Sequence, residues 1–420
     1  NHFAYTGGYG KALLVTLAPV INVLNGTKYA LKYDDGAERV FFDTIFKSYF
    51  PVIINGGVMD MVRSREISRI GGQDHVSGRQ VIRAIISVTD LLEGEQKEQA
   101  LSMVKYYMQQ DDRHQIFSDK DVAEFFLEYY VSLGHILRGK EILEDKSIKA
   151  ADPLTGYYNF ADMARVVQRQ KDHSFGLSMY GGNIQTFEVV NEEGTNAWHT
   201  ADGMLYLYNA DKEKYADHFW GAVDHQRLPG TTVDRYNKGG NNRSSTANTS
   251  GAAYGGAQIH GIYGATAFQL NNGVASNKSY FFFDDEAVLL GSGITSASGN
   301  PVETIVENYK ANLDLSNRVT VDGVPQARTD SSADDFNGRH EDVKYIHMEG
   351  NVDGADVGYV FPGGGDVTGL RETRTQKWTL MNNYEKFVDD RDVTKSFITM
   401  YLDHGTNPTD ADYAYIILPG

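Results

Sequence analysis

The chain has 420 residues and a formal net charge of −17, and 23% of its residues are charged. These values describe an ordinary globular protein of one large or two smaller domains. The acidic balance argues against nucleic acid as a general partner, and an anionic polymer would need a local positive site to bind here. The absence of cysteine excludes disulfides, thiolate nucleophiles and sulfur-ligated zinc. No apolar run approaches the length expected of a membrane span, so we expect no membrane partner.

Residues 1–150 are predicted to be mainly helical, because apolar residues recur there at helical spacing. Short polar connections between the segments suit stacked antiparallel helices. The predicted helices are 11–24, 37–50, 76–92, 96–110 and 121–137.

The pattern changes near Asp152-Pro153, and residues 151–420 are predicted to form an antiparallel β domain. Short alternating or aromatic segments there are separated by Gly, Asn and Asp. The segment 235–256 is rich in Gly, Asn and Ser and is predicted to be a long exposed loop. The fold class is therefore α+β. Examples of predicted strands are 203–208, 279–290, 357–361 and 413–418.

Three arginines, Arg63, Arg65 and Arg69, fall within seven residues of this acidic chain. If the segment 59–69 is helical, Arg65 and Arg69 share a face. Guanidinium groups offer a fixed charge and a forked donor set suited to carboxylates. The segment is therefore a candidate anion subsite. The alternative is a solvated basic turn in which Glu66 is an ion-pair partner.

A glycine-rich turn, Tyr5-Thr6-Gly7-Gly8-Tyr9-Gly10, precedes the first predicted helix. Glycines on both sides of Tyr9 allow a sharp turn that leaves its ring at a cavity wall. A phenol can act as a general base or acid where cations stabilise its anion. His2 is either a second proton-transfer group or a frayed terminal residue. The alternative for Tyr9 is a packed turn residue.

A second cluster of polar residues lies at 188–203. Glu188 and Asn191 could orient the arginines, and Trp198 offers a face on which a sugar ring could stack. The alternative is that Glu188 is an ordinary strand carboxylate and His199 a loop histidine. No zinc-type ligand spacing, nucleophile elbow or P-loop is present. The segment 407–412 could hold a structural calcium ion but lacks the EF-hand pattern.

Six motifs span nearly the whole chain: YTGGYG at 5–10, MDMVRSREISR at 59–69, NEEGTNAWHTADGMLYLYN at 191–209, LPGTT at 228–232, FDDEAVLLGSGI at 283–294 and DHGTNP at 403–408. In this order they resemble polysaccharide lyase family 8. The family includes hyaluronate, chondroitin AC and xanthan lyases, and the motifs look most like those of xanthan lyases.

The resemblance implies an incomplete α/α toroid followed by an antiparallel β super-sandwich, and β-elimination at a uronic acid. In the family an Asn neutralises the uronate carboxylate, a Tyr shuttles the proton, a His assists it, and arginines with a Glu complete the site. Carried over by position, the catalytic residues are Tyr9, Arg65, Arg69 and Glu188. Predicted substrate-binding residues are Arg63, Asn191, Trp198, His2 and Tyr384.

The resemblance also carries departures. The spacing places the family's catalytic His and carboxylate-neutralising Asn before Asn1, and a further C-terminal β domain after Gly420. Ser64 stands where the family has Gly. Gly71 and Tyr384 (after Asn382-Asn383) stand where pyruvate-recognising xanthan lyases carry a Tyr and an Arg. We therefore expect an internal portion of a longer enzyme, with pyruvate dependence open.

The function expected from this resemblance is that of a secreted, monomeric lyase of an acidic polysaccharide that requires no cofactor. Xanthan, cleaved at its mannosyl-glucuronate side-chain linkage, is the first expected substrate, and hyaluronan or chondroitin is the alternative. A non-catalytic polysaccharide-binding fragment and an inert scaffold are the two other classes of interpretation.

Overall fold

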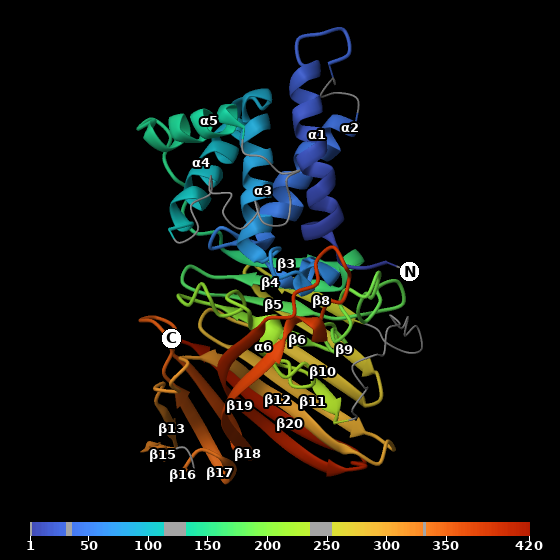
Figure 1. Cartoon of the computed structure of the whole chain (residues 1–420), viewed down its shortest axis with the longest axis vertical. Helices are drawn as coiled ribbons and strands as arrows, with labels where there is room; N and C mark the ends of the chain where they lie inside the picture. Colours follow the sequence, from blue (N-terminus) through green and yellow to red (C-terminus); the bar gives the residue numbers. More distant parts are fainter. Residues whose placement is uncertain (1, 31–35, 113–131, 236–253, 331–332) are drawn as a thin grey trace. The chain divides into compact units, whose positions relative to one another are not determined.

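The computed structural model describes residues 2–30, 36–112, 132–235, 254–330 and 333–420 (Figure 1). Contacts along the chain divide it into two compact units. One is Tyr5–Leu154, which is helical. The other is Asn1–Ala4 together with Thr155–Gly420, which is built mainly of strands.

The helical unit begins with a π-helical turn, Thr6–Gly10, that continues directly into the first α-helix. Its helix α3 is buried along nearly its whole length and packs against α1, α4 and α5. The phenol of Tyr107 on α4 donates to the carbonyl of Phe50 at 2.8 Å, which ties two segments of the unit together. The elements are α1 (Lys11–Leu24), α2 (Ala37–Thr44), β1 (Ile53–Ile54), β2 (Gly57–Val58), α3 (Asp74–Val88), α4 (Gly94–Gln110) and α5 (Leu133–Glu144).

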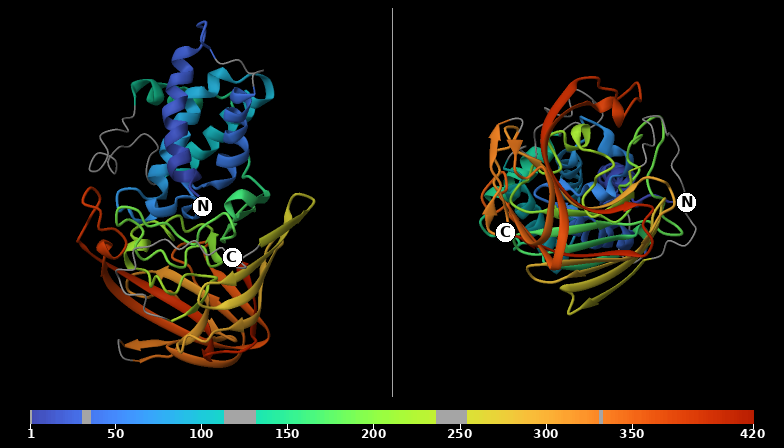
Figure 2. Two further views of the ribbon diagram at one scale, coloured as in Figure 1. Left: turned by 90° about the vertical axis from the view of Figure 1, so that its right-hand side faces the viewer. Right: turned by 90° about the horizontal axis from the view of Figure 1, so that it is seen from below.

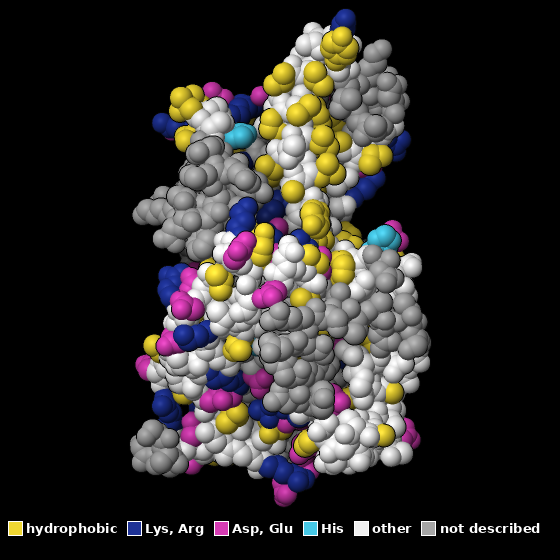
Figure 3. Space-filling model, turned by 45° about the vertical axis from the view of Figure 1, so that its right-hand side comes forward, with side chains coloured by type: hydrophobic (Ala, Val, Ile, Leu, Met, Phe, Trp, Pro, Cys, Tyr) yellow, Lys and Arg dark blue, Asp and Glu magenta, His cyan; other side chains and the backbone are white. Residues whose placement is uncertain are grey.

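Helix α1 leaves one apolar face uncovered. Leu13, Val20 and Val23 are exposed, and Figure 3 shows this stripe in yellow along the upper part of the view. The stretch Thr6–Leu24 is long and apolar enough to cross a membrane by length and composition, and a third of it is buried. The expectation that no apolar run reaches this length was therefore wrong. The core helix of a globular protein passes the same test.

A four-stranded antiparallel sheet opens the β unit, in the order β3-β4-β5-β6. Strands β4, β5 and β6 are buried along their whole length, as expected of strands covered on both faces. The strands are β3 (Gly156–Phe160), β4 (Arg165–Arg169), β5 (Ser174–Ser178) and β6 (Met204–Tyr208), and a short helix, α6 (Phe219–Ala222), follows them.

The second sheet is larger and also antiparallel (Figure 2). Its path runs β14-β13-β17-β18-β20-β11-β10-β9-β8, while β12 pairs with β19 and β7, and β19 with β18. One apolar cluster includes residues from both sheets, such as Phe175 and Leu205 from the first and Tyr280 and Ile398 from the second. The strands are β7 (Thr232–Asp234), β8 (Tyr254–Ile259), β9 (Tyr263–Asn271), β10 (Ala275–Phe282), β11 (Ala287–Thr295), β12 (Pro301–Ala311), β13 (Val319–Val321), β14 (Val324–Pro325), β17 (Gly338–Met348), β18 (Val357–Lys377), β19 (Asp392–Thr406) and β20 (Ala411–Pro419), and β15 (Arg328–Asp330) pairs with β16 (Ala333–Asp334) apart from this sheet.

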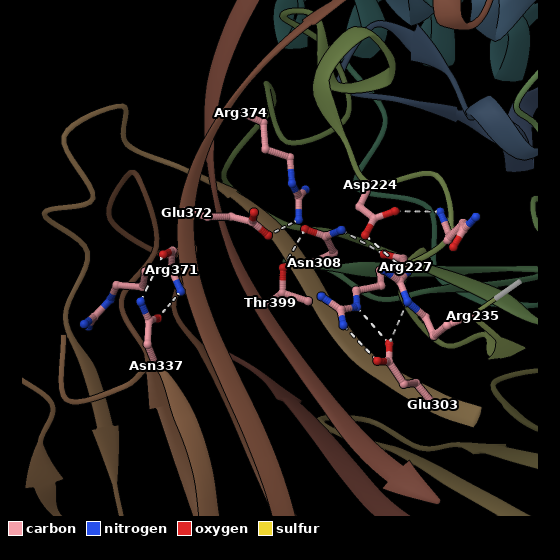
Figure 4. A network of polar contacts seen from close by, with 11 residues as sticks. Asp224, Arg227, Arg235, Glu303, Asn308, Asn337, Arg371, Glu372, Arg374 and Thr399 are labelled. Atoms are coloured by element: carbon pink, nitrogen blue, oxygen red, sulfur yellow. Dashed lines mark hydrogen bonds and ion pairs between the residues drawn. The ribbon is translucent and has the colours of Figure 1, made fainter. Parts of the chain in front are cut away.

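Strand β12 carries charged side chains into the interior, and Figure 4 shows the partners of one of them, Glu303. Arg227 donates two hydrogen bonds of 2.8 Å to the carboxylate of Glu303. Arg235 forms ion pairs with both Glu303 and Asp224. Burial works against the charge of Arg227, but Glu303 outweighs it and holds the pKa of Arg227 above its ordinary value. The network therefore fixes the segments on both sides of β7 onto β12.

Most predicted elements are confirmed, with changes of extent. The first predicted helix is α1, and the next three contain α2, α3 and α4. For the fifth, residues 121–131 lie outside the described residues, and α5 covers its end. The predicted strand 279–290 is two strands, β10 and β11, joined by a turn in which Phe283 N–H donates to Glu286 O. The predicted loop 235–256 lies mostly outside the described residues, but its end is strand β8.

The loop 407–412 is a tight connection between β19 and β20. Asn407 and Asp410 have positive φ angles of 52° and 59°, and the Asn407 side chain accepts from the Gly299 N–H. Among the described residues no group of three or more His, Asp or Glu side chains is placed to hold a metal ion. Calcium at this loop therefore stays a prediction without support from a ligand cluster.

Buried histidine generates a testable pH dependence of stability. Burial lowers the pKa of His225 to about 4, although its bond to the Trp220 carbonyl acts in the opposite direction. An unfolded histidine titrates near 6.5, so the unfolded state binds more protons between those two values. The free energy of unfolding should therefore fall by roughly 3 kcal/mol as the pH drops from 6.5 to 4. Denaturant titrations across this range measure it.

His225→Gln should make this slope shallower, because an amide can still donate to the Trp220 carbonyl but does not titrate, while His404, whose pKa burial also lowers to about 4, keeps its own contribution. His260→Asn, at an exposed position with a positive φ angle, is the matched control and should keep the slope. Equal slopes in the His225 variant and the parent would contradict the account.

Candidate active site

The turn Thr6–Gly10 has glycine at positions where no side chain fits. A Cβ on Gly8 would lie 1.8 Å from Cε2 of Tyr5, and one on Gly7 would lie 2.8 Å from Cγ of Arg63. The carbonyl of Tyr5 accepts from the N–H groups of Gly8 and Gly10, both at 3.1 Å. This wide turn packs the Tyr5 ring against the backbone and brings the next tyrosine, Tyr9, to the surface.

Arg65 lies against both tyrosines of this turn. Its Nη2 donates to the Tyr9 phenol oxygen at 3.0 Å. Its guanidinium carbon lies 5.3 Å from the ring centre of Tyr5 and 5.4 Å from that of Tyr9. The two rings meet edge to face with centres 4.9 Å apart. Arg65 is buried, whereas Tyr9 is 64% exposed, so a fixed cation supports a phenol that a substrate can reach.

Arg69 is held by a carboxylate rather than by the phenol. Glu66 Oε1 lies 3.4 Å from Arg69 Nη1, and Glu66 Oε2 accepts from Lys11 Nζ at 2.9 Å. Burial alone would raise the pKa of Glu66, but Lys11 and Arg69 outweigh it and lower that pKa. Burial lowers the pKa of Lys11, and Glu66 offsets part of this effect. Lys11 also donates to Ser77.

The segment is not the α-helix that a shared face for Arg65 and Arg69 would need. Residues Ser64–Ser68 form a 3₁₀ turn, and Arg69 is already extended. Ser64 has φ = 47°, in the left-handed region that favours glycine. A glycine, which the family has at this position, would adopt this backbone conformation without strain.

Arg63, predicted to bind substrate, is 1% exposed and donates to Asp60. Burial would lower its pKa, but Asp60, Glu66 and Asp74 outweigh that effect and raise it. Its Nε and Nη2 are buried and find no hydrogen-bond partner among the residues that the structure describes. The surroundings favour a supporting role over direct contact with a substrate.

In the β unit, the segment carrying Asn191 is bonded to the segment carrying Tyr384. Gly194 N–H donates to Met381 O at 2.8 Å, and Asn383 N–H donates to Glu192 O at 3.0 Å. Asn191 and Glu192 have positive φ angles of 54° and 65°. The surrounding hydrogen bonds hold these two residues in their strained backbone conformation, as is common at functional sites.

The other predicted residues of the β unit differ in exposure. Glu188 is buried, and Asn191 is exposed. Trp198 is 4% exposed, and its indole nitrogen has no hydrogen-bond partner in the described part of the chain. Its ring faces are therefore covered, which does not fit the predicted stacking role. His2 is exposed and forms an isolated bridge to Ile184. The N–H of Tyr384 donates to the Asn382 side chain.

The structure forms a carboxylate–imidazole pair in this unit that the sequence patterns did not predict. Asp202 Oδ2 lies 2.7 Å from Nδ1 of His199, and both residues are buried. Asn272 donates to both oxygens of Asp202. The spacing of three between His199 and Asp202 was visible, but Asn272 is seventy positions away and no local pattern marks it.

Family comparison places the chain in a known class. The N-terminal α-helical domain of polysaccharide lyase family 8 matches residues 1–106, and its super-sandwich domain matches residues 155–420. The chain belongs to polysaccharide lyase family 8.

Among individual proteins, the chain is 36% identical to a xanthan lyase from Bacillus sp. (strain GL1) over 421 residues, which is 99% of this chain and 43% of that protein. It is 30% identical to a hyaluronate lyase from Thermasporomyces composti, over 100% of this chain and 51% of that one. The chain thus spans about half the length of these relatives or less.

Solved structures of lyases are also similar to this chain. The structure of Paenibacillus xanthan lyase matches with a TM-score of 0.88 and 38% identity, covering 100% of this chain and 38% of that one. The chondroitin AC lyase of Streptomyces coelicolor A3, solved with chondroitin sulphate, matches with a TM-score of 0.80 and 30% identity, covering 99% and 53%. The expected fold, a helical toroid portion followed by a β super-sandwich, is confirmed.

The bridging role of Glu66 can be tested by its neutral analogue. Glu66→Gln leaves buried Lys11 without its counter-charge, so we expect the helical unit to lose about 3 kcal/mol of stability. Denaturant unfolding followed by circular dichroism measures it. Asp43→Asn, which breaks the exposed pair with Lys47, is the control and should leave the stability nearly unchanged. Equal losses would show that Glu66 does not support the arginine cluster.

Proposed function

We propose that this chain carries catalytic groups of an extracellular polysaccharide lyase that cleaves the bond at a glucuronic acid residue by β-elimination. The observation that carries the proposal is the Arg65–Tyr9 contact: a buried guanidinium donating at 3.0 Å to an exposed phenol oxygen. Membership of the family and similarity to xanthan lyases support it.

The chemistry begins with a proton that is hard to remove. The C5 hydrogen of a uronate becomes acidic only when its carboxylate charge is neutralised and the forming enolate is stabilised. The Tyr9 phenolate, stabilised by Arg65, takes the C5 proton. The electron pair becomes the C4–C5 double bond, the C4–O bond breaks, and the departing oxygen takes a proton, which the Tyr9 hydroxyl can supply.

The surrounding residues complete the proposal. Arg69 and Lys11, with Glu66 between them, leave a net positive charge in the helical unit that carries Tyr9, in a chain whose net charge is −17. Such a local field attracts an acidic polysaccharide that the chain as a whole would repel. By their positions in the family motifs, Glu188 and Asn191 assist in orienting the substrate. The elimination consumes no water and needs no cofactor.

Xanthan is the proposed substrate, cleaved at the mannosyl-glucuronate linkage, because xanthan lyases are similar in sequence and structure. Hyaluronan and chondroitin are the alternatives, since lyases of those names also match. Incubation of the protein with each polymer separately, followed by ultraviolet absorbance of the new double bond, should give the fastest rise with xanthan. Binding without any rise would indicate a polysaccharide-binding protein instead.

Tyr9→Phe tests the proposed base. Losing the phenol oxygen should reduce turnover by at least about a hundred-fold while the fold is kept, because general acid–base groups contribute about 10²–10⁴. Tyr29→Phe, at another exposed tyrosine, is the matched control and should leave turnover unchanged. An undiminished rate in the Tyr9 variant would remove Tyr9 from the mechanism.

Arg65→Lys separates charge from geometry. Lysine keeps the charge but cannot lie flat over two rings while donating to the phenol. We expect turnover to fall roughly ten- to a hundred-fold, with the exposed Arg39→Lys unaffected. Full activity in the Arg65 variant would show that only a diffuse positive charge is required.

A further inference from the structure

The group of strands β8–β11 presents an exposed face without charge. In a chain that is 23% charged, these strands contain one charged residue, Lys278, and it is buried on the opposite face. Along β9 and β10 buried and exposed positions alternate, so one face packs inward and the other meets solvent. Figure 2 shows these strands, drawn in yellow, at one end of the large sheet.

Two side-chain amides face each other on this surface, near the turn between β9 and β10. Gln269 on β9 is directly paired with Asn277 on β10, and Asn271 is paired with Ala275 two positions along. Paired residues of antiparallel strands project to the same side. The side-chain amides of Gln269 and Asn277 make no hydrogen bond with another group in the described part of the chain.

A depression lies between these amides. It has a volume of about 210 Å³, and its lining includes Gln269, Asn271, Ala275, Asn277 and Gly293. The register between β10 and β11 shifts between Ala275 and Asn277, and Gly293 has φ = 66°. A bulge at this point and the small residues Ala275 and Gly293 leave the space that the longer amide side chains border.

The side chains that line the depression indicate which kind of ligand it can bind. An amide offers both donors and acceptors, which is what a sugar hydroxyl requires, whereas a lysine or carboxylate offers only one kind. No charge has to be desolvated when a neutral ligand binds. The volume is below the ~300–1,000 Å³ of pockets that enclose drug-sized molecules, which suits one sugar ring lying in a shallow groove.

We propose that this charge-free face, Gln269, Asn271, Ala275, Asn277 and Gly293, binds neutral, hydroxyl-rich sugar units of a polysaccharide. It lies apart from Tyr9 and the arginine cluster in the chain's organisation, since those residues belong to the helical unit. It would hold uncharged parts of the polymer while the basic cluster engages the uronate. The identity of that polymer rests on the proposed function, but the binding of neutral sugar does not.

The test is calorimetric titration with a neutral probe, the β-1,4-linked glucose hexamer, and in a second arm the β-1,4-linked mannose hexamer. We expect saturable binding of at least one probe. Gln269→Ala/Asn277→Ala should weaken it at least about ten-fold, because the facing amides are lost. Gln258→Ala, an exposed glutamine on β8 whose cross-strand partner Gly264 is buried, is the matched control and should bind as the parent does.

Ala275→Lys provides a variant that keeps both amides. Its position is exposed, so the strand can accept the longer side chain, which fills the depression and should abolish binding. Failure of both probes to bind, or unchanged binding in the variants, would overturn the proposal. So would a dimer in sedimentation velocity that Ala275→Lys dissociates, because the face would then be an interface between copies.

The lyase assay distinguishes the two proposals. Turnover of a short acidic oligosaccharide should be unchanged in the double variant, since none of its residues belongs to the catalytic cluster. Probe binding in a protein that shows no lyase activity would contradict the proposed function alone.

Discussion

The contact between the Arg65 guanidinium and the Tyr9 phenol is the interaction on which the helical unit's chemistry depends. The two residues are 56 positions apart, and several unusual local structures are needed to bring them together. Tyr9 lies in a π-helical turn, and Arg65 lies in a 3₁₀ turn. Glycines in the first turn leave space for the Tyr5 ring and for Arg63. Each of these features is less favourable than a regular helix, so the geometry must be stabilised by the contacts that it makes.

The charged side chains around this contact are also stabilised by the contacts that they make. Four cations gather in a small buried region, and isolated charges there would be costly. Asp60 neutralises Arg63, and Glu66 joins Lys11 to Arg69. Arg65 lies against the two aromatic rings and donates to the phenol oxygen. Its positive charge therefore stands next to the place where an anion would form at the phenol.

Much of this could be predicted from the sequence, because helical periodicity and strand alternation are local signals. Helix Lys11–Leu24 was predicted with its observed bounds. The motifs also pointed to Tyr9 together with Arg65 and Arg69, and the structure shows the phenol in contact with Arg65. The break between β10 and β11 was missed because the apolar residues on both sides of the acidic turn were interpreted as one continuous strand. The pairing of the Asn191 and Tyr384 segments could not be predicted, since it rests on backbone bonds between distant loops.

The most direct test of the central claim is a double-mutant cycle on turnover that combines Tyr9→Phe with Arg65→Lys. If Arg65 acts by stabilising the Tyr9 anion, its replacement has nothing further to remove once the phenol is gone. The double variant should then be about as slow as Tyr9→Phe alone. Additive losses, with the double variant slower by the full product of the single effects, would show that the two residues act independently and would contradict the account.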